Sequence, residues 1–223
     1  MKVCVTMVGV CRPSFERVKQ NIESNIAYFL TAYPQHEFIF IVLTYINGFH
    51  DDLSKFCLDK GIEAHFIPHI EDSAIDKSLK RPNFYRLVYS MNYILDKIPK
   101  DIYDCIIRIR IDAEIKSFEI YNTIEPMKYY TINNAGRCSD NIGYASYTVM
   151  KRVWNLNNYK IKAIDAEELV YKSIKRLNYF IKHFKFHFIL YQSIDPIFDG
   201  VVQWSRRSRE WIYDGSKYIS NDI

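Results

Sequence analysis

The sequence predicts one α/β domain over residues 1–223, built on a mixed, mostly parallel sheet with helices on both faces. Strand and helix patterns alternate from the N-terminus. Residues 38–45 form a continuous apolar run, which is typical of a parallel strand buried on both faces. No repeat, low-complexity tract or linker divides the chain, and its length suits a single core of ordinary size.

The first third of the chain is the most regular part. A strand over residues 3–10 leads to a helix over residues 15–33, with Ser14 as its N-cap and Pro34 as its stop. The apolar run at residues 38–45 is the second strand. A helix over residues 51–60, a glycine and a short strand over residues 63–67 follow. This β-α-β-α-β order predicts right-handed crossovers and a parallel sheet.

The rest of the chain begins with a polar segment at residues 70–82. An amphipathic helix over residues 84–95 and a strand over residues 105–111 come next. The second half is less regular, and for it we expect the following elements: a strand near residues 129–133, a loop through Asp140, helices over residues 147–154 and 166–177, and a strand over residues 183–191.

Composition narrows the classes of function. The net charge of +4 favours anionic ligands but is small for a nucleic-acid-binding surface. Seven glycines are too few for the chain to bind phosphate mainly through glycine-rich loops. The five cysteines lack C-x-x-C spacing, which favours a reducing compartment. The N-terminus is unlike a signal peptide, and the longest apolar run is too short to cross a bilayer.

We therefore expect a cytoplasmic protein with no membrane span and no nucleic-acid partner. The bias toward Ile, Lys, Asn and Tyr indicates an AT-rich genome, either bacterial or that of a large virus. The cytoplasm would then be that of a bacterial cell or of the host of a virus.

The most informative stretch is the strand pattern at residues 105–111 and the acids after it. Arg108 and Arg110 share one face of this apolar strand, and Asp112 and Glu114 follow where it ends. A buried strand tolerates charge when the charge is paired or binds a ligand. Two carboxylates one residue apart suit Mg²⁺ or Mn²⁺ held against a diphosphate. The simpler interpretation is a polar turn after an edge strand, with both arginines facing solvent.

Three predicted strands end in residues suited to ligand binding. These ends are residues 9–12, residues 44–45 and residues 110–114. In open α/β sheets, ligands bind in the crevice beyond the carboxyl ends of the strands. Contributions from three different strands are what a nucleotide crevice requires.

Four segments, in order over residues 3–178, carry a resemblance to a known family. They are Cys11-Arg-Pro-Ser-Phe-Glu-Arg17 after the first strand, Arg81-Pro-Asn-Phe-Tyr-Arg86-Leu, Ile106-Ile-Arg-Ile-Arg-Ile-Asp112, and Glu167-Glu168-Leu169. Together they resemble glycosyltransferases of GT-A type that build bacterial or viral surface polysaccharides and capsid glycans. The third segment is similar to an Arg-x-Arg-x-Asp variant of the D-x-D motif in that family. Glu114 stands where a second Asp would be.

The resemblance implies a Rossmann-like GT-A domain that moves a sugar from a UDP- or GDP-sugar to a hydroxyl of a glycan or glycoprotein. It implies Mn²⁺ or Mg²⁺ held by Asp112 and Glu114, and a carboxylate base for an inverting reaction. We expect Arg108, deeper in the strand, to orient the carboxylates. The remaining candidates are Arg12, Arg81, Arg86, Arg110 and Asp112 for the donor, and Glu167, Glu168 and Asp140 for the base.

Several alternatives stay open. The protein could be a non-catalytic carbohydrate- or nucleotide-binding module, which its 18 tyrosines would suit. A sugar-1-phosphate nucleotidyltransferase is a weaker alternative, because Gly9-Val-Cys-Arg12 is poor in glycine. Acids in the first turn of a helix, such as Glu167 and Glu168, are favoured by the helix dipole alone.

Two further features have simple explanations. His183 and His187 fall on a strand pattern without an H-E-x-x-H motif, so we expect a solvated strand face rather than a zinc site. The basic segment from Trp204 to Trp211 could fold over a diphosphate, but an exposed amphipathic tail is the simpler interpretation.

Overall fold

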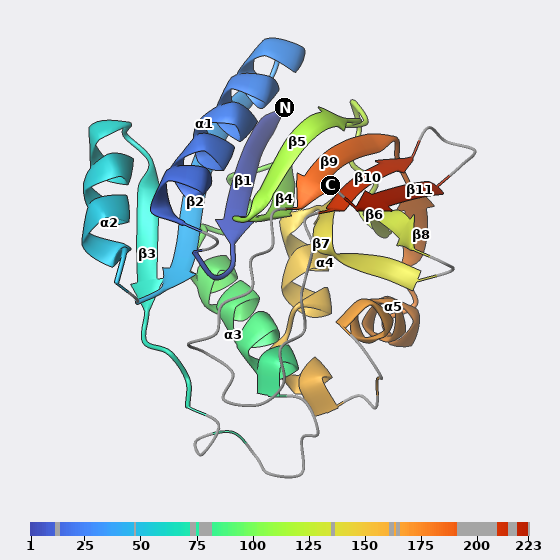
Figure 1. The fold of residues 1–223 in the computed structure, drawn as a ribbon. Helices are drawn as coiled ribbons and strands as arrows, with labels where there is room; N and C mark the ends of the chain where they lie inside the picture. Colours follow the sequence, from blue (N-terminus) through green and yellow to red (C-terminus); the bar gives the residue numbers. More distant parts are fainter. Residues whose placement is uncertain are drawn as a thin grey trace.

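A seven-stranded sheet forms the centre of the computed structural model, with strand order β3-β2-β1-β4-β7-β6-β8 (Figure 1). The structure describes residues 1–11, 14–46, 48–71, 75, 82–134, 137–160, 163, 166–190, 209–213 and 218–222. The strands of this sheet are β1 (Lys2–Val8), β2 (Glu37–Tyr45), β3 (Glu63–Ile67), β4 (Cys105–Arg110), β6 (Lys128–Asn134), β7 (Arg137–Ala145) and β8 (Phe180–His183).

Strand β7 alone runs against the other strands of this sheet. Strands β3, β2, β1 and β4 run parallel to one another. Strand β7 is antiparallel to both β4 and β6, and β8 is parallel to β6. The prediction of a mixed, mostly parallel sheet is therefore confirmed, and the change of direction falls between β4 and β7.

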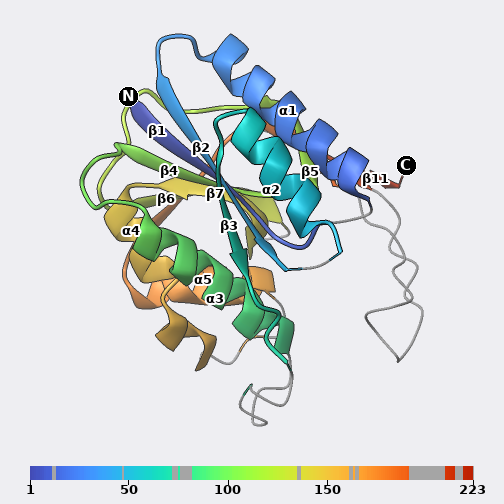
Figure 2. The ribbon, with the colours of Figure 1, turned by 90° about the vertical axis from the view of Figure 1, so that its left-hand side faces the viewer.

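Helices cover both faces of the sheet, as expected (Figure 2). Helices α1 (Phe15–Ala32) and α2 (His50–Asp59) lie on one face. Helices α3 (Pro82–Lys97), α4 (Tyr147–Val153) and α5 (Ala166–Arg176) lie on the other, and a 3₁₀ helix, η2 (Leu156–Lys160), follows α4. Each face has its own hydrophobic cluster, so the sheet is buried on both sides.

The predicted helix ends have the expected local causes. The Ser14 hydroxyl accepts a hydrogen bond from the backbone N–H of Arg17 at 3.3 Å, which caps α1. Helix α1 ends at Tyr33, directly before a proline. Gly61, just after α2, has a φ of +66°, which a glycine adopts without strain.

A second, antiparallel sheet with order β11-β10-β9-β5 stands beside the first, and the sequence pattern did not predict it (Figure 1). Its strands are β5 (Ala113–Phe118), β9 (Phe186–Leu190), β10 (Arg209–Tyr213) and β11 (Tyr218–Asp222). Asn25 of α1 holds β5 in place. Its side-chain amide donates to the carbonyl of Ala113 and accepts from the N–H of Ile115, both at 2.8 Å.

Three expectations about the second half were wrong. Asp140 lies in β7 rather than in a loop. The single strand expected over residues 183–191 is two strands, β8 and β9, which belong to different sheets. The break falls at Phe184, which is buried against Phe118 with a ring-centroid distance of 4.6 Å. Residues 209–213 of the expected tail pair with strands on both sides, while Trp204 lies outside the described residues.

Within the described ranges, none of the helices is both long and apolar enough to cross a membrane. The side chains of Cys4, Cys11, Cys57 and Cys105 are buried free thiols. Burial raises the pKa of Cys11 and Cys57 to about 11 in both cases. These thiols therefore pack as small hydrophobic groups.

Candidate functional site

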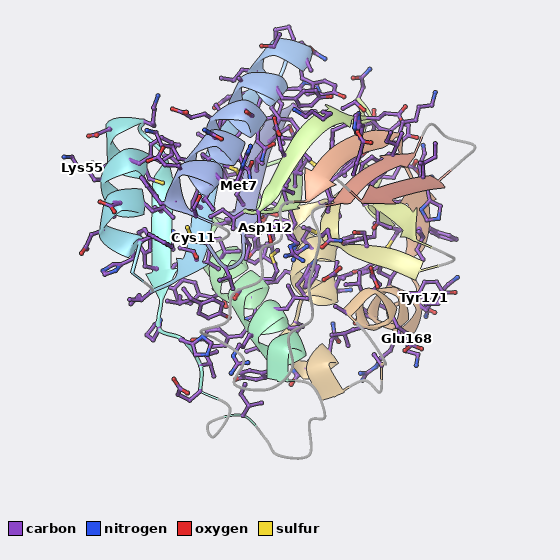
Figure 3. All side chains as sticks on the ribbon, in the orientation of Figure 1. Met7, Cys11, Lys55, Asp112, Glu168 and Tyr171 are labelled. Carbon is purple, nitrogen blue, oxygen red and sulfur yellow. The ribbon has the colours of Figure 1, made fainter. Side chains whose placement is uncertain are left out.

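The candidate site lies at the carboxyl end of β4, beside β1, where the strand order of the sheet (β3-β2-β1-β4) reverses. Neighbouring chain segments diverge at such a point, which leaves room for a ligand in α/β sheets. The ends of β1 and β2 are joined here, because the N–H of Gly9 donates to the carbonyl of Leu43 at 3.1 Å. Gly9 has a φ of +152° and its backbone passes close to Ile111. Cys11 and Asp112 lie at this same edge of the sheet (Figure 3).

Arg110 and Asp112 form a two-pronged ion pair at the centre of the site. Arg110 donates from Nε to Oδ1 of Asp112 at 2.8 Å and from Nη2 to Oδ2 at 2.5 Å. A third bond runs from Nη1 to the side-chain oxygen of Asn141 on β7 at 3.1 Å. Burial by itself lowers the pKa of Arg110, but the charge and hydrogen bonds of Asp112 outweigh it and raise that pKa.

The two members of this pair differ in exposure. The Arg110 side chain is 17% exposed, whereas that of Asp112 is 2% exposed. The arginine is therefore the more exposed member of the pair. It orients Asp112, which is the role that the sequence assigned to Arg108.

Arg108 is instead a buried cation without a hydrogen-bond partner for two of its nitrogens. The residue is 1% exposed, and Nε and Nη1 have no partner among the residues that the structure describes. Its guanidinium carbon lies 4.7 Å from the ring centroid of Trp154, at the end of α4. Burial lowers the pKa of Arg108 to about 10, and the charge of Asp140 partly counters this effect.

The simpler interpretation of the arginines is excluded by their surroundings. Strand β4 lies between β1 and β7, so it is a central strand and not an edge strand. Neither arginine faces open solvent. Both charged groups are largely buried. Burying a charge costs free energy, so each arginine must serve a structural or ligand-binding role.

Strand β7 brings further polar groups to the two arginines. Asp140 is partly buried, and its negative charge raises the pKa of both Arg108 and Arg110. Asn141 is buried, and its backbone N–H donates to the hydroxyl of Ser139 at 3.0 Å. Of the three acids predicted as a base, Asp140 is the one that these electrostatic effects place near the arginines.

The predicted metal ligands do not fit Mn²⁺ or Mg²⁺ in the geometry described. Both oxygens of Asp112 are held by Arg110. The Glu114 carboxylate is 15% exposed and contacts Nζ of Lys116 at 2.6 Å. Across the described ranges, no three His, Cys, Asp or Glu side chains group as a metal site. A divalent ion would need Arg110 to leave Asp112 first.

The other predicted residues lie farther out or outside the described ranges. Glu167 and Glu168 are in the first turn of α5, and Glu168 pairs with Lys172 at 2.9 Å. Figure 3 shows Glu168 on α5, well apart from Asp112. Arg12 and Arg81 fall on residues that are not described.

Arg86 acts as a structural tie rather than an open cation. Its Nε donates to the carbonyl of Ile70 at 2.8 Å, which anchors the segment that follows β3. The Tyr45 hydroxyl, at the end of β2, donates to the carbonyl of Arg86 at 2.9 Å. The donor-binding role predicted for Arg86 stays a prediction.

The two late histidines do not share a site. His183 on β8 contacts the carbonyl of Thr131 through Nδ1 at 3.2 Å. His187 on β9 contacts the carboxylate of Glu210 through Nε2 at 2.8 Å. They belong to different sheets, which agrees with the expectation that they do not form a zinc site.

Three residues of the site were missed by sequence reasoning: Asn141, Trp154 and Tyr129. The indole N–H of Trp154 donates to the Tyr129 hydroxyl at 3.3 Å, and the Trp154 ring packs against the Arg108 guanidinium. A buried arginine needs aromatic or acidic neighbours, but the sequence does not show which ones.

Compared with models of protein families and with curated protein sequences, the chain matches none.

Proposed function

We propose that this protein is a glycosyltransferase that moves a sugar from a nucleoside-diphosphate donor to a hydroxyl of a glycan. The observation that carries the proposal is the Arg110–Asp112 pair at the carboxyl end of β4, with the buried Arg108 behind it. The leaving group of such a donor is a diphosphate. Its developing negative charge requires fixed positive groups in a site of low dielectric constant.

The chemistry assigns one task to the cations and another to an acid. The acceptor oxygen forms a bond to the anomeric carbon while the bond from that carbon to the diphosphate breaks. The electron pair of the broken bond goes to the diphosphate, and the acceptor proton goes to a carboxylate. Asp140 is our first choice for this base, because its charge acts on both arginines. Glu167 and Glu168 remain candidates, and an inverting course depends on such a base.

The test is a screen of UDP-, GDP- and CMP-sugars for donor hydrolysis and for transfer to glycan acceptors. Asp112→Ala should abolish both activities, because it removes the group that holds Arg110. Circular dichroism should show an unchanged fold in this variant. Lys116→Ala, on the neighbouring strand, serves as a matched control that should keep its activity. Full activity in Asp112→Ala would refute the proposed site.

The main alternative is a carbohydrate- or nucleotide-binding module without catalysis. The buried state of Asp112 favours it, since both carboxylate oxygens are occupied by Arg110. Thermal unfolding separates the two functions. Stabilisation by a nucleoside diphosphate together with donor hydrolysis supports the transferase, whereas stabilisation by free sugar alone, or by a nucleotide without any hydrolysis or transfer, indicates the module. A sugar-1-phosphate nucleotidyltransferase would be indicated by formation of a nucleotide sugar from a nucleoside triphosphate.

A further inference from the structure

We infer that Arg110 takes the place of a divalent ion at Asp112, so that the leaving diphosphate is neutralised by arginine and without a metal. This inference rests on the proposed function and concerns the same site. It replaces the predicted pair of metal ligands with a pair of cations. The reason is the difference in solvent exposure between the cation and the carboxylate.

The exposed member of the ion pair is the cation. Arg110 is 17% exposed and Asp112 is 2% exposed, so a ligand from solvent meets the guanidinium first. An arriving divalent cation is repelled at this point, whereas an anion is attracted. A metal site would need the opposite order, with carboxylate oxygens toward the solvent.

Arg110 is also fixed in position and keeps N–H groups to donate. Its three bonds to Asp112 and Asn141 come from β4, the turn after it and β7, which holds the guanidinium plane in one orientation. A guanidinium has more N–H donors than these three bonds use. Within the described part of the chain, these bonds leave one N–H on each of Nη1 and Nη2. Such a pre-oriented pair of donors suits a phosphate oxygen pair.

Arg108 adds a second positive charge behind the first. It is 1% exposed, so it acts on a bound diphosphate through its electric field and not through direct contact. Two of its nitrogens lack a partner in the described part of the chain, so its charge is less compensated than that of Arg110. In transfer, the electron pair of the broken bond moves onto the diphosphate oxygen nearest these charges. The acceptor proton leaves to a carboxylate, as above.

The experiment measures the binding of UDP and of GDP by calorimetry, once in EDTA and once with Mn²⁺. We expect one of the two to bind in EDTA with an affinity within about twofold of that with Mn²⁺. Arg110→Gln should weaken this binding at least tenfold, because it removes the cation and its fork. Arg110→Lys keeps the charge without the fork. Its affinity for the nucleotide should lie between that of Arg110→Gln and that of the unmodified protein. Arg176→Gln, at an exposed arginine on α5, should bind like the unmodified protein.

The outcomes separate this inference from the function on which it rests. Binding that needs Mn²⁺ would overturn the inference and leave the transferase intact. Unchanged binding in Arg110→Lys and Arg110→Gln would also overturn it. If neither nucleotide binds under either condition and no donor is hydrolysed, the proposed function itself fails. If Arg110→Gln does not fold, Arg110→Lys decides, since its charge still neutralises Asp112.

Discussion

The same substitution at two positions on β4 should change stability in opposite directions. Arg108 and Arg110 lie on one face of the strand, two residues apart, and each is replaced by methionine in a separate variant. Arg108 is a buried cation, and two of its nitrogens have no hydrogen-bond partner among the residues that the structure describes. Arg110 neutralises a carboxylate that is 2% exposed. The first substitution removes an electrostatic cost, and the second creates one.

The structure gives the sizes of both effects. The lowering of the pKa of Arg108 from 12.5 to about 10 corresponds to roughly 3 kcal/mol of cost for the charged form. The stacking on Trp154 returns about 1–2 kcal/mol of this. Arg108→Met should therefore raise the free energy of unfolding by about 1–2 kcal/mol. Arg110→Met removes two hydrogen bonds and an opposite charge from the buried Asp112 carboxylate and should lower that free energy by about 3–5 kcal/mol.

Urea unfolding followed by circular dichroism at pH 7 measures both values. A pH series adds a second check. Because the folded-state pKa of Arg108 lies below its unfolded value, its cost is complete at neutral pH and is relieved as the pH rises through about 10. The stability gap between Arg108→Met and the unmodified protein should then narrow above pH 10. A loss of stability of more than about 1 kcal/mol in Arg108→Met at pH 7 would refute the reasoning.

Two more predictions concern the elements that frame the site. Asn25→Ala should lower the free energy of unfolding by about 2–5 kcal/mol, because the carbonyl of Ala113 and the N–H of Ile115 lose their partner. Urea unfolding measures this, with Gln20→Ala on the exposed side of α1 as a control that should change little. Gly9→Ala should cost roughly 1–3 kcal/mol, because a φ of +152° is strained for an L residue. A thermal midpoint unchanged within error would contradict that expectation.

The parallel half of the sheet follows from local sequence patterns. The apolar run of β2, the cap at Ser14 and the glycine after α2 each act within a few residues of the chain. Such signals predict element type and order well. For the same reason, the residues at the ends of β1, β2 and β4 meet at one edge, as expected.

The second sheet could not be predicted in this way. Strand β5 is short and pairs with β9, whose residues lie more than sixty positions later in the chain. The break between β8 and β9 depends on Phe184, whose ring enters the core beside Phe118 and Tyr144. A period-2 pattern continues across such a break, so the sequence cannot show it. Pairing across this distance is decided by packing.

The sequence predicted that the ends of β1, β2 and β4 share one edge, but not how the charged residues there pair. Sequence spacing places two arginines on one face of β4 and two acids after it, yet it does not say which cation pairs with which acid. That choice depends on β7, because Asn141 accepts the third hydrogen bond of Arg110 and the charge of Asp140 raises the pKa of Arg108. The element that decides the chemistry was expected to be a loop.

The buried Arg108, two of whose nitrogens have no hydrogen-bond partner among the described residues, is the strongest argument that this edge of the sheet has a function. A methionine at this position would be shorter but would avoid the cost of burying a charge beneath Trp154. Trp154 and Asp140 offset only part of that cost, so stability alone gives little reason for an arginine here. Residues that weaken a fold are typical of functional sites. Arg108→Met should accordingly be the variant that gains stability and loses nucleoside-diphosphate binding, a combination that a purely structural role cannot produce.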